Sequence, residues 1–189
     1  MTSKWTQVDR DSEANVPTML AQAIIIGTVL GVGAICCCGF YLTMIGRVVA
    51  LLPWMGMVTL IAVAFTYVVG FALLWCAEAY TGRMRERFKP LAYGVIGLIG
   101  YAVWGVLVMT TLMNSLDQRL NGTVLSNGNV IALAVNYAIF GFLAFALAKI
   151  YSPALAARKT LAFTLLGIQI VLAVIGIVVM VMVFSALYR

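Results

Sequence analysis

The side chains that usually carry out acid–base, nucleophilic or metal chemistry are scarce in this sequence. It contains no histidine, which excludes histidine-ligated haem, the usual zinc ligand, and Ser-His-Asp or Cys-His catalysis. Beyond the first 17 positions the acidic residues are Glu78, Glu86 and Asp117, and no two of them fall together at membrane depth. We therefore predict no catalytic centre, no metal site and no cofactor, and a protein that is not an enzyme.

The four cysteines are the remaining reactive groups. Cys36, Cys37 and Cys38 are consecutive, so on a helix their side chains point about 100° apart and do not converge on one metal. Cys76 is expected to lie on the order of 25–30 Å from them, near the other end of a helical hairpin. The sequence has no Cys-x-x-Cys motif. We interpret the cysteines as packing residues, with thioacylation of Cys76 as the less favoured reading.

Long apolar runs dominate the chain and must position these groups. Of 189 residues, 64% are hydrophobic and 10% are charged, whereas soluble domains carry about 25% charged residues. A membrane-crossing helix needs about 20 mainly apolar residues. Five stretches satisfy this length, after a polar segment at 1–17: about 18–45, 53–79, 90–115, 129–151 and 153–187.

These runs predict an all-α membrane protein. The runs are too long, and alternate too little, for strands of a membrane barrel. We expect a compact bundle of about five transmembrane helices with short loops, forming a single domain over residues 18–189. Pro90 is expected in the first turn of the third helix, and Ser152-Pro153 at the start of the fifth.

The basic residues predict the orientation of the bundle. Nine lie on one side of the predicted spans and three on the other: Lys4, Arg10, Arg83, Arg85, Arg87, Lys89, Lys149, Arg158 and Lys159, against Arg47, Arg119 and Arg189. Lys and Arg are enriched in cytoplasmic loops. We predict a protein of the plasma, inner or an organellar membrane, with its N-terminus on the cytoplasmic side and its C-terminus on the opposite side.

Small residues recur at helical spacing in two of the predicted spans. Such ridges let helix backbones approach closely within lipid, where no hydrophobic force drives association. The residues expected to pack against other helices are Ala23, Gly27 and Gly31 in the first span, and Gly94, Gly97 and Gly100 in the third. The pattern does not distinguish contacts within the chain from contacts with a partner.

Two amides interrupt the apolar runs of the last two spans. Asn136 lies a third of the way into the fourth, and Gln169 lies near the middle of the fifth. An amide in hydrocarbon needs a hydrogen-bond partner, so the simpler interpretation is an interhelical bond. The alternative is that Asn136 and Gln169 line a polar cavity for a solute or a lipid head group.

A basic segment joins the second and third spans. It contains Arg83, Arg85, Arg87 and Lys89 within seven residues. Each such residue near a membrane surface contributes about 1 kcal/mol to the attraction of anionic lipid. Ordinary topology determination explains the same pattern and is favoured, with contact to anionic lipid as the alternative.

With no catalytic chemistry visible, helix surfaces are the main functional evidence. We predict a non-catalytic accessory, assembly or structural subunit of a larger membrane complex. Its partners would be the lipid bilayer together with other membrane subunits or copies of itself, and not nucleic acid. A small transporter or channel component acting as an oligomer is the alternative, and a membrane enzyme acting on lipid ranks third.

Overall fold

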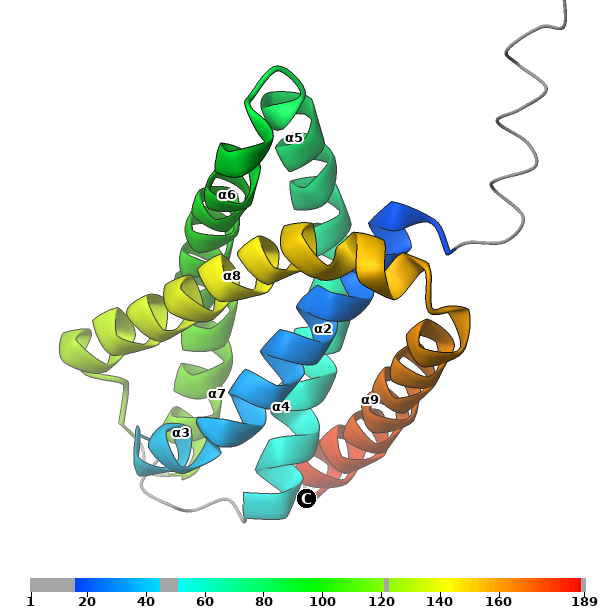
Figure 1. Cartoon of the computed structure of the whole chain (residues 1–189). Helices are drawn as coiled ribbons and strands as arrows, with labels where there is room; N and C mark the ends of the chain where they lie inside the picture. Colours follow the sequence, from blue (N-terminus) through cyan, green and yellow to red (C-terminus); the bar gives the residue numbers. More distant parts are fainter. Residues whose placement is uncertain (1–15, 45–50, 121–122, 188–189) are drawn as a thin grey trace, which may run out of the picture.

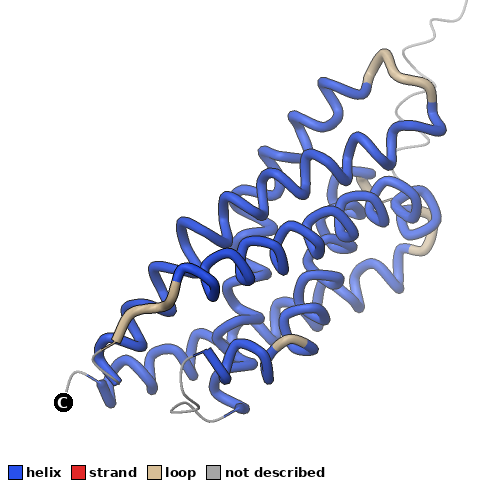
Figure 2. The backbone as a smooth tube through the Cα atoms, turned by 90° about the vertical axis from the view of Figure 1, so that its left-hand side faces the viewer, coloured by secondary structure: helices blue, strands red, loops and turns tan. Residues whose placement is uncertain are grey.

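The computed structural model of the protein describes residues 16–44, 51–120 and 123–187, and helices make up the regular secondary structure of these ranges. Within these ranges, five helical segments are long and apolar enough to cross a membrane: Thr18–Cys36, Leu52–Thr81, Glu86–Gln118, Asn127–Ala156 and Lys159–Ala186. They run side by side as an elongated bundle (Figure 2). The predicted all-helical membrane fold is confirmed, and the outer faces of these helices contact lipid.

The first span is shorter than predicted because it breaks at the cysteine triplet. Helix α2 (Thr18–Cys36) ends there, Cys37 forms a turn, and a short helix α3 (Cys38–Met44) follows. Backbone bonding continues across the break, since the N–H of Cys37 donates to the Gly33 carbonyl and the N–H of Tyr41 to the Cys37 carbonyl. Most of the predicted polar segment 1–17, and residues 46–50 between the first two predicted spans, lie outside the described residues.

The second and third spans each contain a π-helical turn that the sequence did not predict. Each consists of an α-helix, a π turn and a second α-helix: α4 (Leu51–Phe65), η1 (Thr66–Gly70) and α5 (Phe71–Thr81), then α6 (Lys89–Trp104), η3 (Gly105–Met109) and α7 (Thr110–Leu120). A 3-10 turn, η2 (Glu86–Phe88), precedes α6. The predicted place of Pro90, in the first turn of the third span, is confirmed.

The boundary between the last two spans differs from the prediction. Helix α8 (Asn127–Ala156) begins after the N-cap Ser126, whose Oγ accepts from the N–H of Asn129, and continues through Pro153. Helix α9 (Lys159–Leu187) begins only after the turn at Ala157 and Arg158. Pro153 is tolerated in the last turn of α8 because it removes a single backbone donor there. Of the two charged residues here, Arg158 lies in the turn and Lys159 begins α9.

Helix α2 occupies the interior of the bundle (Figure 1). It packs against α8, α4 and α9, while α6 packs on α8 and α4 packs on α9. In the most apolar 18-residue stretch of α2, 56% is buried, whereas in that of α9 only 11% is buried. The described chain is therefore a core of α2, α4, α6 and α8 with α9 attached along α4.

Glycines set the closest helix contacts. A Cβ added at Gly97 would meet the carbonyl oxygen of Gly141 in α8, and one at Gly176 of α9 would meet that of Gly56 in α4. The other predicted ridge positions also face neighbours within the chain: Gly94 faces Phe142, Gly100 faces Leu73, Gly27 faces Gln169, Gly31 approaches Thr59, and Ala23 is buried. These contacts lie inside one chain, and the importance of the ridges for stability remains a prediction.

Candidate functional site

A polar cluster ties together the bundle end at which α2 begins. Glu78 accepts from the Tyr93 hydroxyl (2.5 Å) and the Gln22 amide (3.5 Å), and Lys149 lies 3.5 Å from the same carboxylate. The backbone N–H of Val16 donates to the Ala156 carbonyl at this end. Seven of the nine predicted cytoplasmic cations, which lie in the α5–α6 and α8–α9 connections or in the adjoining turns of α6, α8 and α9, therefore gather at one end of the bundle. Which side of a membrane this end faces remains a prediction.

Gln169 sits in a closed hydrogen-bonded site at the junction of α2, α4–α5 and α9. Its Nε2 donates to the Ile24 carbonyl (2.7 Å) and the Thr28 hydroxyl (2.8 Å), and its Oε1 accepts from the Tyr67 hydroxyl (2.8 Å). The side chain is 4% exposed, and the missing side chain of Gly27 leaves room for it. A cavity of about 90 Å³ with an almost entirely apolar lining adjoins it.

Asn136 belongs to a different contact, at the opposite end of the bundle. Its Oδ1 accepts from the Tyr41 hydroxyl (2.6 Å), and its Nδ2 lies 3.5 Å from the Cys37 sulfur. None of the four cavities described in this section is lined by both Asn136 and Gln169. The structure thus does not bring the two amides together, and a pathway role for either stays a prediction.

The four cysteines are all free thiols. Cys36 is exposed, Cys37 is partly buried, and Cys38 is buried with its sulfur 3.2 Å from the Ala34 carbonyl. No group of three or more potential metal ligands among His, Cys, Asp and Glu occurs in ranges 16–44, 51–120 and 123–187. The three consecutive thiols thus differ in exposure and in contacts.

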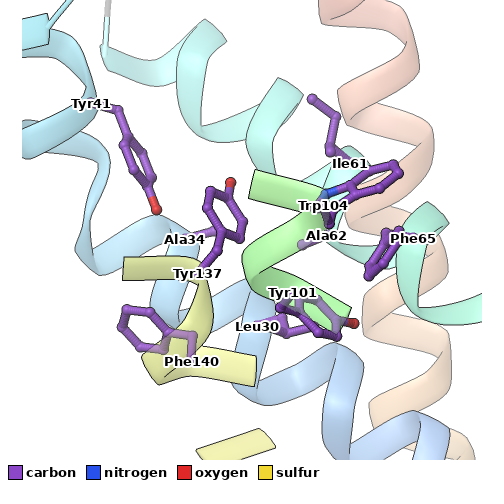
Figure 3. Close-up of a pocket in the computed structure, with 10 residues that line it drawn as sticks. All are labelled: Leu30, Ala34, Tyr41, Ile61, Ala62, Phe65, Tyr101, Trp104, Tyr137 and Phe140. Atoms are coloured by element: carbon purple, nitrogen blue, oxygen red, sulfur yellow. The ribbon is translucent and has the colours of Figure 1, made fainter. Parts of the chain in front are cut away.

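An aromatic cluster fills the middle of the bundle (Figure 3). Its rings come from α3, α4, α6 and α8 and surround a cavity of about 10 Å³, space for about one water molecule: Tyr41, Phe65, Tyr101, Trp104, Tyr137 and Phe140. Phe65 stacks on Trp104 with ring centroids 3.8 Å apart and meets Tyr101 edge-on at 4.7 Å. Phe65 and Trp104 are the residues immediately before the two π turns. Single π turns occur frequently at functional sites.

One hydroxyl in this cluster lacks a well-aligned partner. Tyr101 is 1% exposed, and its phenolic oxygen has only a weak polar contact with the Thr66 side chain and makes no hydrogen bond of good geometry within the described residues. The Thr66 hydroxyl nearby donates to the Ala62 carbonyl (2.8 Å). An unsatisfied buried polar group costs about 1–3 kcal/mol, so an acceptor atom from outside the chain would be stabilised there. Sequence reasoning missed this group because nothing in the sequence distinguishes an unpaired tyrosine from a paired one.

A lipid-facing cleft lies on the other side of the Phe65–Trp104 pair. It measures about 270 Å³ and its lining is almost wholly apolar: Ile61, Ala64, Phe65, Val68, Val69, Trp104 and Val108. Val68 at its rim is 75% exposed, on a surface that faces lipid. Ile61, Phe65 and Trp104 also line the central cavity. These side chains therefore form a wall one residue thick between the bilayer and Tyr101.

Comparison with known proteins identifies a family. A sequence model of eukaryotic cytochrome b561 matches residues 2–120, which include the first three spans. Helices α8 and α9 lie outside the match. No curated protein and no solved structure matches the chain.

The match overturns the functional prediction made from the sequence. The family is one of transmembrane redox proteins, so the expectations of a non-catalytic accessory subunit and of a non-enzyme are wrong. The alternative of a small transporter or channel component is wrong for the same reason. Those predictions treated the absence of histidine as evidence for the class of protein, whereas it restricts only the cofactor that the chain can hold.

The haem implied by the family name does not fit the described residues. The chain has no histidine, and haem iron otherwise takes Cys, Met or Tyr ligands. Cofactor sites usually measure about 300–1,000 Å³, yet the cavities beside Tyr101 and Gln169 measure about 10 and 90 Å³. A groove of about 460 Å³ exists, but its two potential ligands, Tyr80 and Met84, are only four residues apart, at the end of α5 and in the turn that follows it, and do not come from facing helices. The chain belongs to the eukaryotic cytochrome b561 family, as a member without histidine.

Proposed function

We propose that this protein takes part in redox transfer at the membrane by binding a lipid-soluble quinone in the cleft beside Phe65 and Trp104. The family match over residues 2–120 carries the redox part of the proposal. The cleft and the unpaired Tyr101 hydroxyl support the ligand class. Histidine-held haem has no part in it, since the chain offers no histidine.

The chemistry of the cleft suits a quinone. Its apolar lining and exposed rim give access to a ligand that partitions into lipid. The flat Phe65–Trp104 pair offers a surface on which a flat ring stacks. A carbonyl oxygen that reached past the Phe65 side chain would accept a hydrogen bond from Tyr101, which would remove the cost of leaving that hydroxyl unpaired.

Quinone binding is tested in detergent by quenching of tryptophan fluorescence with a short-chain benzoquinone. Tyr101→Phe is expected to weaken binding about 10-fold, which corresponds to the loss of one hydrogen bond of about 1.4 kcal/mol. Ala64→Leu fills the cleft and is expected to abolish saturable quenching. Tyr151→Phe is the matched control, because Tyr151 is 56% exposed and lies in none of the cavities described above. Equal affinities for wild type, Tyr101→Phe and Tyr151→Phe would contradict the proposal.

The redox part needs its own measurement. On oxidation a quinol gives up two electrons and two protons, so two ferricyanide ions take one electron each while the protons pass to water. Ferricyanide is expected to oxidise the quinol faster in vesicles that contain the protein than in empty vesicles. Ala64→Leu is expected to remove this difference in rate. An absorption spectrum with the Soret and α bands of a b-type haem would overturn the conclusion that haem does not fit this chain.

The basic end of the bundle is proposed to face the cytoplasm. The support is the nine-to-three distribution of Lys and Arg, seven of the nine being gathered at one described end. Cysteine labelling from outside intact cells tests this orientation. A cysteine placed at Lys159 is expected to stay unlabelled until the membrane is permeabilised.

A further inference from the structure

A second surface, separate from the cleft of the proposed function, lies where α5 turns into α6. A groove of about 460 Å³ opens here, with an almost wholly apolar lining: Tyr80, Met84, Phe88, Leu91, Ala92, Val95 and Ile96. Tyr80 is 80% exposed and Leu91 57%. Leu91, Val95 and Ile96 belong to the first two turns of α6, so the groove extends from the end of the bundle into the apolar part of the third span.

Cations adjoin the residues that line this groove. Met84 and Phe88, which line it, alternate along the chain with Arg83, Arg85 and Arg87, all exposed. The Arg87 guanidinium lies over the Phe88 ring, 4.7 Å from its centroid. The nearby carboxylates are already engaged, Glu86 by Lys89 (2.6 Å) and Glu78 by Tyr93 and Lys149. For the three arginines, no ion-pair partner is found within the described ranges.

We propose that this groove and its arginines form a binding site for one anionic phospholipid. The acyl chain lies along Leu91 and Val95, and the phosphate meets Arg83, Arg85 and Arg87. The combination selects a lipid over a free anion, because a soluble phosphate would leave the apolar groove unfilled. It selects an anionic lipid over a zwitterionic one, because the positive charge at the mouth is not balanced within the loop. Guanidinium groups are well suited to phosphate oxygens.

The site is tested on the purified full chain in mild detergent, with fluorescent phosphatidylglycerol as the probe and its anisotropy as the readout. Arg83→Gln with Arg85→Gln is expected to lower affinity about 30-fold, the equivalent of about 1 kcal/mol for each cation. Val95→Trp, which occupies the groove without changing charge, is expected to lower it by at least 10-fold. The fluorescent phosphatidylcholine analogue is expected to bind no more tightly than the double variant binds the anionic probe.

Matched controls separate a built site from general attraction to basic protein. Arg158→Gln with Lys159→Gln removes two exposed cations at the same end, away from the groove, and Val103→Trp adds the same bulk further along α6. Both are expected to bind like wild type. Equal losses in the two charge variants would overturn the proposal. A second result would also overturn the proposal: millimolar glycerol phosphate displaces the probe, and Val95→Trp binds the probe normally. That result would indicate a site for the head-group anion alone.

Discussion

Replacing Gly97 with alanine is expected to destabilise the protein by about 3 kcal/mol, within the range for overpacking a close contact. The added methyl group would meet the Gly141 carbonyl oxygen and the Phe145 side chain across the α6–α8 interface. Backbone on the facing helix cannot move aside as a flexible side chain can, so α6 and α8 must separate. Unfolding in mixed micelles with increasing fractions of a denaturing detergent measures the effect.

Two other glycines serve as controls for this prediction. Gly167→Ala should be neutral or stabilise slightly, since nothing lies within 4 Å of the added carbon and alanine is the better helix former. Gly100→Ala should fall between them, because the atoms that it meets are the flexible end of Leu73. If Gly97→Ala unfolds at the same detergent fraction as Gly167→Ala, the close approach of α6 to α8 is wrong.

Replacing Gln169 with leucine is the second change with a large expected effect, about 2 kcal/mol. Three hydrogen bonds are lost, and hydrogen bonds between membrane helices are worth about 0.6 kcal/mol on average. Tyr67 is also left with an unpaired hydroxyl, as Oε1 of Gln169 is its acceptor. Because these bonds join α9 to α2 and to the second span, loosening of α9 should precede global unfolding. A fluorophore attached at the exposed Val181 of α9 would report that loosening.

A double-mutant cycle isolates one of these bonds. Tyr67→Phe alone should cost less than Gln169→Leu, and the double variant should cost less than the sum of the two. Strict additivity of the two changes would contradict the direct bond between Tyr67 and Gln169.

The sequence predicts the helices well because helix length and hydropathy are fixed by the thickness of hydrocarbon. It places Pro90 correctly, since proline is tolerated in a first turn. The sequence misplaces the start of the last span, because Pro153 does not begin α9 but is accommodated in the last turn of α8. The π turns at Thr66 and Gly105 were not predictable, because one extra residue per turn leaves the apolar character of a run unchanged.

The candidate site was predictable only in part. Gln169 could be identified because an amide stands out in an apolar run and must find a partner. Tyr101 could not, since its significance lies in a bond that it fails to make in three dimensions. The family is recognised from a sequence pattern spread over residues 2–120. The absence of histidine is more conspicuous than that pattern, and it led the interpretation away from redox chemistry.

The length of the third span has a consequence for the surrounding lipid. The segment Glu86–Gln118 has 33 residues, so it extends about 50 Å along its axis, whereas the hydrocarbon core of a bilayer is about 30 Å thick. The ends of this segment carry charged residues, among them Lys89 and Asp117, which extend towards the head groups, so only the apolar part between them has to match the hydrocarbon thickness, by tilting or by a local change in the lipid. The lipids next to this span are therefore expected to be those whose chain length suits its apolar part.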